Sequence, residues 1–156
     1  MITTWDEKFI KLCNLIASWS KDRSTKVGAV IVNGRNKLVS VGYNGFPIGF
    51  DDNVDQRHER PQKYEYTEHA ERNAIYSAAE LGVSVKGCTM YLCWFPCPDC
   101  ARAIIQSGIS KLVCKSFDVQ DPKWGDGFLK SKEMLVECGV ELKFIPDADF
   151  DRITNA

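Results

Sequence analysis

The chain contains 156 residues, of which 44% are hydrophobic and 26% charged, and its formal net charge is −1. The length fits one domain over residues 1–156, and the composition is ordinary for a soluble globular protein. The near-neutral charge gives no general attraction to a polynucleotide or an anionic membrane, and no apolar run approaches the roughly 18 residues needed to cross a bilayer.

The N-terminal sequence and the cysteines indicate the compartment. The stretch from Met1 to Glu7 lacks the basic and apolar regions of a secretory signal peptide. The chain has seven cysteines, an odd number, and two of them form a Cys-x-x-Cys pair of the kind found in metal sites. These features favour a reducing compartment over a disulfide framework, so we expect a cytoplasmic protein.

The N-terminal part predicts a helix and a hairpin. Thr4 and Glu7 form a capping box, and apolar residues at helical spacing continue to about Trp19. After a polar loop, the β-branched run 27–32 predicts a buried strand. A second strand over 38–43 returns through an Asn-Gly turn.

Periodicity is lost over 44–65, which predicts a long excursion from the domain. Structureless loops of that length are uncommon in compact domains unless they bind something. A helix is then expected, capped by Thr67 and ending near Gly82. Its inward face is expected to contain Ala74, Ile75, Ala78 and Ala79.

The C-terminal half alternates strands with helices. Pro98 suits a first helical position, and Gly108 should end that helix. The remaining elements are strands over 88–93, 111–116 and 141–145 and a helix over 126–138. We expect the acidic tail after Pro146 to fray. The alternation predicts an α/β sandwich around one sheet.

Two short motifs, His69-Ala70-Glu71 and Pro96-Cys97-Pro98-Asp99-Cys100, carry the chemistry. They offer one imidazole and two thiolates, and three soft ligands suit Zn²⁺ while leaving a coordination position for water. Glu71 is then available as a proton carrier beside the metal. Because both motifs precede helix-like segments, we expect a cavity between two helix N-termini, whose partial positive charge lowers thiolate pKa values.

Two other interpretations of these residues are open. A structural zinc site would need a fourth ligand, and His58 is the only other histidine. His58 lies in the long excursion, where an ordinary loop position is the favoured interpretation. A redox dithiol usually follows a thioredoxin-like strand without a paired His-x-Glu. The combination of both motifs favours the catalytic interpretation.

The two motifs together resemble the zinc-dependent nucleobase deaminases, a signature that includes the non-ligand Glu. The resemblance extends to the deoxycytidylate deaminase branch and covers roughly residues 5–145. It is carried by Ser24-Thr25-Lys26-Val27-Gly28-Ala29-Val30, Gly42-Tyr43-Asn44-Gly45, His69-Ala70-Glu71-Arg72-Asn73-Ala74-Ile75, Phe95-Pro96-Cys97-Pro98-Asp99-Cys100-Ala101 and Gln106-Ser107-Gly108-Ile109. It implies a three-layer α/β/α sandwich around a five-stranded mixed sheet.

The resemblance also implies the reaction. His69, Cys97 and Cys100 would hold one Zn²⁺, whose bound water attacks C4 of the cytosine ring. Glu71 would take the proton of that water, deliver it to N3 and then protonate the departing amine. The expected reaction converts dCMP to dUMP with release of ammonia and supplies thymidylate synthesis.

Substrate contacts are expected from several places. The resemblance assigns sugar binding to Asn44 and base binding to the backbone N–H groups of Ala70 and Cys97, although Asn44 also suits a plain turn. It places Arg23, Ser24 and Lys26 near the 5′-phosphate, and each of these could equally be an ordinary solvated side chain. Trp94 or Phe117 could stack on the base, but an aromatic beside a strand is more often core.

Regulation and assembly are also implied by the resemblance. Several deoxycytidylate deaminases bind dCTP as activator and dTTP as inhibitor in the excursion that corresponds to residues 42–66, and its first residues Gly42, Tyr43 and Gly45 are intact here. The following stretch, Phe46-Pro47-Ile48-Gly49-Phe50, departs from the small-residue version of that loop, which argues against regulation. A homo-oligomer, dimer or hexamer, is expected. The cysteines outside the motif are expected to be small buried residues: Cys13, Cys88, Cys93, Cys114 and Cys138.

Two rival functions remain at this level. The first is a deaminase acting on another base, such as modified dCMP, guanine or an RNA nucleotide, although the near-neutral charge argues against a polynucleotide substrate. The second is a non-catalytic zinc scaffold, which would have no need of Glu71.

Overall fold

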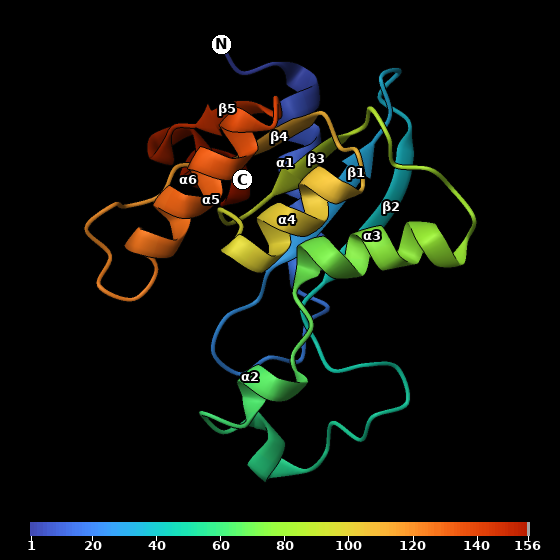
Figure 1. The fold of residues 1–156 in the computed structure, drawn as a ribbon, viewed down its shortest axis with the longest axis vertical. Coiled ribbons are helices and arrows are strands. Elements are labelled where there is room, and N and C mark those ends of the chain that lie inside the picture. Colours follow the sequence, from blue (N-terminus) through green and yellow to red (C-terminus); the bar gives the residue numbers. More distant parts are fainter. Residues whose placement is uncertain (156) are drawn as a thin grey trace.

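The structure is a computed structural model that describes residues 1–155. One five-stranded mixed sheet runs through it in the order β2-β1-β3-β4-β5 (Figure 1). Its strands are β1 (Gly28–Val32), β2 (Leu38–Tyr43), β3 (Thr89–Leu92), β4 (Lys111–Lys115) and β5 (Glu141–Ile145). Strand β1 is antiparallel to both β2 and β3, whereas β3, β4 and β5 are parallel. The predicted five-stranded mixed sheet is confirmed.

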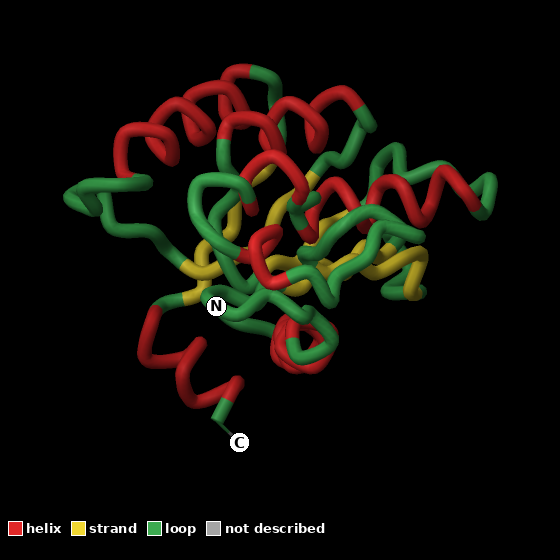
Figure 2. The backbone as a smooth tube through the Cα atoms, turned by 90° about the horizontal axis from the view of Figure 1, so that it is seen from below, coloured by secondary structure: helices red, strands yellow, loops and turns green. Residues whose placement is uncertain are grey.

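Helices cover both faces of the sheet. They are α1 (Thr4–Ala17), η1 (Asp55–His58), α2 (Lys63–Tyr66), α3 (Ala70–Glu80), α4 (Pro98–Gln106), α5 (Gly125–Glu137) and α6 (Asp147–Thr154). Figure 2 shows α3, α4 and α5 on one side of the sheet and α1 and α6 on the other. The predicted three-layer α/β/α arrangement is therefore confirmed.

The pleat of β1 divides the core in two. Ala29 and Ile31 face a large apolar cluster built with α3, α4 and α5. Val30 and Val32 face a second cluster built with α1 and α6. All four side chains are buried because successive residues of a strand point to opposite faces and both faces are covered.

Two helix starts differ from the sequence prediction. The N-cap of α1 is Thr3, not Thr4, and its capping-box partner is Asp6. This choice follows from burial, because the Asp6 carboxylate lies in the interior, where further partners reach it. The N-cap of α3 is His69 rather than Thr67, so the helix begins within the metal-type motif itself.

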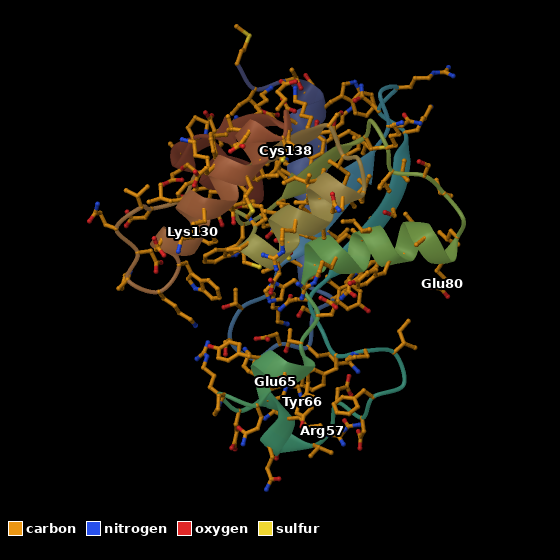
Figure 3. All side chains as sticks on the ribbon, viewed as in Figure 1. Arg57, Glu65, Tyr66, Glu80, Lys130 and Cys138 are labelled. Atoms are coloured by element: carbon orange, nitrogen blue, oxygen red, sulfur yellow. The ribbon has the colours of Figure 1, made fainter. Side chains whose placement is uncertain are left out.

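The C-terminal tail forms α6 and does not fray, so that prediction was wrong. Phe150 and Ile153 lie three positions apart and bury their side chains in the cluster shared with α1. Two other side chains predicted to be buried are instead exposed: Ala79 on α3 and Cys138 at the end of α5. Figure 3 labels Cys138 at that end of α5. The other four cysteines outside the motif are buried as expected.

The long excursion forms a lobe that projects from the sheet and contains η1 and α2 (Figure 1). A pair of backbone hydrogen bonds between Gly45 and Glu68 closes its base. The lobe contains a small, partly exposed aromatic cluster that includes Phe46, Phe50 and Tyr66. Figure 3 shows that Arg57, Glu65 and Tyr66 belong to this lobe. Among the described residues, no helix is long and apolar enough to span a membrane.

Gly42 lets the edge strand β2 lie directly against α3. A Cβ atom at this position would lie 2.3 Å from the backbone nitrogen of Ala74 and 2.4 Å from the carbonyl oxygen of Ala70. Any other residue would therefore push away the first turns of α3. Since α3 begins at the His-Ala-Glu motif, this close approach fixes the position of the site.

Candidate active site

The two motifs meet at the N-termini of α3 and α4. His69 is the N-cap of α3 and Cys97 is the N-cap of α4, with Pro98 at the first helical position. The Nδ1 atom of His69 lies 3.5 Å from the Sγ atoms of both Cys97 and Cys100. The three donor atoms all lie within 4.8 Å of one another, close enough to share one metal ion.

The charges at this site are coupled. A hydrogen bond with Cys100 lowers the pKa of Cys97 to about 4, against the effect of burial, and His69 contributes in the same direction. The pKa of Cys100 is raised, first by the same hydrogen bond and then by burial. The pair thus favours the thiolate at Cys97 over that at Cys100. Such a thiolate is the form that ligates a metal.

Glu71 lies beside these donors without being one of them. Its side chain is 4% exposed and lines the same cavity as His69 and Cys97. Burial raises the pKa of this carboxyl, which makes it readier than an ordinary Glu to hold a proton near neutral pH. The arrangement can therefore move a proton next to a bound metal.

A cavity of about 170 Å³ opens in front of these residues. Its walls come from the 20–27 loop, the excursion lobe, the two helix starts and the segment after β4. The lining residues are Asp22, Thr25, Val27, Asn44, Arg60, Lys63, Tyr64, Thr67, His69, Ala70, Glu71, Trp94, Phe95, Cys97, Lys123, Trp124 and Phe128.

Asn44 lies in the cavity wall and also connects two loops. Its Oδ1 accepts a hydrogen bond of 2.8 Å from the backbone N–H of Val27, and its Nδ2 donates one of 2.9 Å to the carbonyl of Thr25. Its own carbonyl accepts from the Ser20 hydroxyl. One amide hydrogen remains for a ligand. The sugar-binding and structural interpretations are compatible at this position.

The three residues expected near a phosphate do not line the cavity. Arg23 forms an exposed ion pair of 2.7 Å with Asp55, and Lys26 is exposed. Ser24 lies at the edge, where its hydroxyl accepts a 3.4 Å hydrogen bond from Lys63. Their neighbours in the same loop face the cavity instead, since Asp22 and Thr25 are lining residues.

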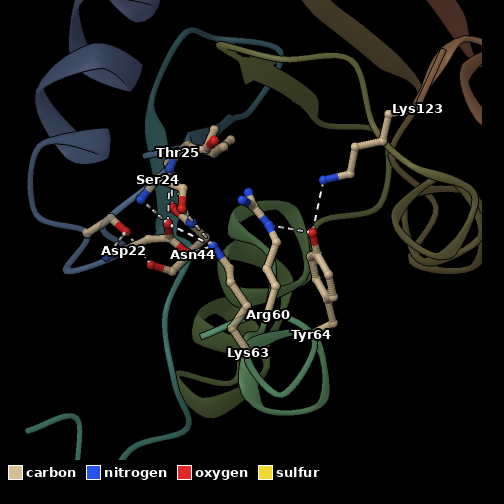
Figure 4. Close-up of polar contacts among 10 residues, drawn as sticks. Asp22, Ser24, Thr25, Asn44, Arg60, Lys63, Tyr64 and Lys123 are labelled. Carbon is tan, nitrogen blue, oxygen red and sulfur yellow. Dashed lines mark hydrogen bonds and ion pairs between the residues drawn. The ribbon is translucent and has the colours of Figure 1, made fainter. Parts of the chain in front are cut away.

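Sequence reasoning missed the contribution of the lobe and of the segment after β4. Arg60, Lys63 and Tyr64 come from the lobe, and Lys123 reaches toward them from the other side (Figure 4). Trp124, the residue after Lys123, also lines the cavity. The sequence signal was the cluster of cationic and aromatic residues within the 44–65 excursion, a segment whose length already indicated a binding role. Their convergence depends on how the lobe folds back, which local patterns do not reveal.

The residues expected to stack on the base, to form the effector loop or to bind a metal do not all lie at the cavity. Trp94 lines the cavity and is half-exposed, whereas Phe117 packs against Phe95 at 4.5 Å in the core. Gly42, Tyr43 and Gly45 lie outside the cavity lining, where Gly42 contacts α3 and Tyr43 contacts Trp19. The Nε2 atom of His58 lies 2.6 Å from the carbonyl oxygen of Asp52 within the lobe. Among the described residues, His58 does not belong to the group of potential metal donors.

Comparison with known proteins agrees with this geometry. Residues 3–116 match the family described as the cytidine and deoxycytidylate deaminase zinc-binding region. A protein of Aliivibrio fischeri described as an uncharacterized deaminase in luxG 3'region is 44% identical over 94% of this chain and 97% of its own length. Human deoxycytidylate deaminase is 39% identical over 97% of this chain and 88% of its own length.

A solved structure shares the fold. The dCMP deaminase from the cyanophage S-TIM5, in complex with dCMP and dUMP, superposes with a TM-score of 0.75 at 26% identity. The match covers 93% of this chain and 99% of the phage chain. The chain belongs to the cytidine and deoxycytidylate deaminase family.

Proposed function

We propose that this chain converts dCMP and water to dUMP and ammonia, with one Zn²⁺ ion held by His69, Cys97 and Cys100. The product would supply thymidylate synthesis. The observation that carries the proposal is the convergence of three soft donors and a buried carboxyl, Glu71, on one cavity. The printed names of the human and phage relatives give the same substrate.

The donor set fits zinc. An imidazole nitrogen and two thiol sulfurs, one already favouring the thiolate, are soft ligands of the type that Zn²⁺ prefers. Three protein ligands leave one position open, as in catalytic zinc sites. When bound there, Zn²⁺ lowers the pKa of a water molecule to about 7 and so makes it a nucleophile at neutral pH.

Glu71 would transfer the protons of this reaction. As a carboxylate it takes one proton from the attacking water and gives it to N3 of the cytosine ring. It then takes the second proton of the added oxygen and gives it to the amine, which leaves C4 as ammonia. Glu71 ends as a carboxylate again, so the reaction balances as dCMP plus water giving dUMP plus ammonia. Its raised pKa suits a group that must both accept and donate.

The cavity walls would hold the rest of the nucleotide. The backbone N–H groups of Ala70 and Cys97 lie at helix N-termini, where such groups lack intrahelical partners and can donate to a base. Asn44 retains one amide hydrogen for the sugar. Trp94 is an aromatic lining residue at the accessible part of the wall, which suits it for stacking on a base.

The test is direct measurement of turnover with matched metal analysis. Protein purified with zinc should convert dCMP to dUMP, with ammonia released in equal amount. A Glu71→Gln variant should lose at least about a thousandfold of the rate, because one group is required for several proton transfers, while its zinc content stays at one ion per chain. Full activity in zinc-free protein, or near-full activity in the variant, would refute the proposal.

The same assay separates the rival functions. A substrate panel of dCMP, CMP, deoxycytidine, dCTP, a modified dCMP and guanine distinguishes a deaminase of another base. An unreactive panel with bound zinc would favour the scaffold. We retain the homo-oligomer, the dCTP and dTTP effectors and a cytoplasmic location as expectations. The seven cysteines are all free thiols in the structure, in keeping with a reducing compartment.

A further inference from the structure

We propose that Cys13 and Cys93 form a redox-sensitive dithiol, which a hydroperoxide converts to a disulfide that slows turnover. Both residues lie in the apolar cluster between the sheet and α1, on the face opposite to α3 and α4 (Figure 2). Neither residue lines the cavity or belongs to the group of metal donors. The effect on turnover rests on the proposed function, whereas formation of the disulfide does not.

The fold brings the two sulfurs together. Helix α1 touches the backbone of β1 at Cys13, because a Cβ atom at Gly28 would lie 2.0 Å from the Cys13 carbonyl oxygen. One step beyond the last pair of the β1–β3 ladder, Gly28 lies beside Cys93, the residue that follows β3. The Sγ atom of Cys13 lies 3.1 Å from the carbonyl oxygen of Tyr91, and the two thiols are hydrogen-bonded to each other. Since the S–S bond of a disulfide is about 2 Å long, small shifts suffice to form it.

The surroundings give the two sulfurs different roles. The hydrogen bond with Cys13 lowers the pKa of Cys93 against the effect of burial, and the backbone N–H of Gly28 contributes in the same direction. Burial raises the pKa of Cys13. Cys93 is also the more accessible thiol, with 7% of the residue exposed against 0% for Cys13. Because the thiolate is the reactive form, we expect a peroxide to react at Cys93, with Cys13 as the second thiol.

The oxidation proceeds in two balanced steps. The Cys93 thiolate attacks one oxygen of hydrogen peroxide, the O–O bond breaks, hydroxide leaves and Cys93 becomes a sulfenic acid. The Cys13 sulfur then attacks the Cys93 sulfur, the S–O bond breaks, and the Cys13 proton leaves with the hydroxyl group as water. The hydroxide of the first step takes up the proton that Cys93 lost on ionisation. Two thiols and one peroxide thus give one disulfide and two water molecules, with two electrons passing from sulfur to oxygen.

The disulfide would act on the active site through one short segment. Cys93 is followed by Trp94 and Phe95, which line the cavity, and then by the metal donor Cys97. Bond formation draws Cys93 toward α1 and so displaces the start of this segment. A misplacement of about 1 Å can cost about a hundredfold in rate, so we expect oxidation to lower kcat/KM for dCMP by about tenfold or more.

Peptide mapping of the zinc-loaded protein tests the disulfide itself. After treatment with hydrogen peroxide and alkylation of the remaining thiols, proteolysis should release a peptide in which Cys13 is linked to Cys93, and dithiothreitol should separate its halves. Cys88→Ala is the matched control, because Cys88 is a buried cysteine of the other apolar cluster, and this variant should give the same linked peptide. No such peptide from the wild type, or a Cys97–Cys100 link in its place, would overturn the proposal. The mapping does not depend on turnover, so it decides the disulfide even if the protein fails to deaminate dCMP.

Activity measured on the same samples tests the effect on the site. The kcat/KM of wild-type and Cys88→Ala protein should fall as the linked peptide accumulates and should recover with dithiothreitol. Cys13→Ala lacks the second thiol and should keep its kcat/KM under the same treatment; if thermal unfolding shows that this variant is not folded, Cys13→Val takes its place. Inactivation of the Cys13 variant at the wild-type rate would place the damage at the metal thiolates. That result, or full activity in protein that carries the link, would contradict control of turnover by this pair.

Discussion

The guanidinium of Arg72 lies 3.7 Å from the carboxylate of Asp99 and thereby joins the first turn of α3 to the first turn of α4. Arg72 also binds the carboxylate of Glu68, at the base of the lobe. Each of these helix turns carries metal donors, and Asp99 lies between Cys97 and Cys100 in the sequence. Arg72 is therefore a positioning residue, because it holds together the two elements whose separation sets the donor geometry.

The first prediction concerns this contact. Arg72→Met should lower the affinity of the site for Zn²⁺ by about tenfold, the lower end of what loss of a supporting contact costs a metal site. Competition with a chromophoric chelator measures this directly. Arg102→Met is the control, because Arg102 pairs with the same Asp99 from its exposed side without reaching α3. Equal affinities in wild-type and Arg72→Met protein would contradict the role.

The second prediction concerns Thr67, which lines the cavity. Among the described residues, its hydroxyl is the buried side-chain polar atom without a hydrogen-bond partner. A buried polar group without a partner is costly, so we expect the substrate to provide one. Thr67→Val removes the hydroxyl at constant shape and should leave the free energy of unfolding unchanged or slightly raised. The value of kcat/KM for dCMP should fall by about fivefold to tenfold.

Steady-state kinetics and chemical denaturation of the same preparation check this prediction. Thr25→Val is a suitable comparison. Thr25 also lines the cavity, but its hydrogen bonds to Asp22 and Asn44 are made by its backbone N–H and carbonyl groups, which the substitution keeps. A Thr67→Val variant with wild-type kcat/KM would show that the Thr67 hydroxyl forms no hydrogen bond with the substrate that contributes to turnover.

Sequence patterns predicted the sheet, its main helices and the metal donors better than the far wall of the cavity and the C-terminal tail. The strands and the presence of helices α3 and α4 follow from local signals: β-branched runs, a proline at the first helical turn and glycines after helix ends. The start of α3 does not, because Thr67 was the predicted cap and His69 is the observed one. The metal donors could be predicted because they lie in two compact motifs. Their meeting depends on Gly42, whose missing side chain admits α3, and that requirement appears only in three dimensions.

The opposite end of the cavity could not be predicted in this way. Arg60 and Lys123 are far apart in sequence, and each alone is an ordinary surface cation. They meet on Tyr64 only because the fold brings the excursion lobe next to the segment after β4. The prediction for the tail after Pro146 was wrong for a related reason. Its acidic composition suggests a solvent-exposed segment, whereas Phe150 and Ile153 pack against apolar residues of α1.

The third prediction concerns the ion pair between Lys63 and Asp22, whose side chains are 9% and 8% exposed. The Asp22 carboxylate also accepts hydrogen bonds from the backbone N–H groups of Ser24 and Thr25, so it holds the 20–27 loop to the lobe. Lys63→Met leaves a buried carboxylate without its cation and should lower the free energy of unfolding by about 3 kcal/mol.

Chemical denaturation at neutral pH measures this change, and the double variant Lys63→Met with Asp22→Asn is the matched comparison. Removing both charges should recover part of the loss, because no uncompensated charge then remains in the interior. A single variant as stable as the wild type would mean that solvent reaches Asp22 freely.

The fourth prediction concerns acid stability and Asp6, whose carboxylate is buried in the first turn of α1. Burial by itself would raise the pKa of this carboxyl, but hydrogen bonds from Lys143, Thr3 and Tyr91 outweigh it and lower the pKa from 3.8 to about 2. Because the folded pKa lies below the unfolded one, the unfolded state binds the proton first. The carboxylate therefore contributes about 2 kcal/mol, present in full above about pH 4 and lost as the pH falls toward 2.

Denaturation curves between pH 2 and pH 7 test this linkage, with chelator present so that metal release does not contribute. Asp6→Asn should be less stable than the wild type at pH 7, and the difference should shrink as the pH falls from about 4 to about 2. Asp126→Asn removes an exposed carboxylate of α5 and should follow the wild-type curve closely. If the gap between Asp6→Asn and the wild type stays constant down to pH 2, the carboxylate titrates alike in both states. The four hydrogen bonds that its carboxylate accepts would then contribute no charge-dependent stability.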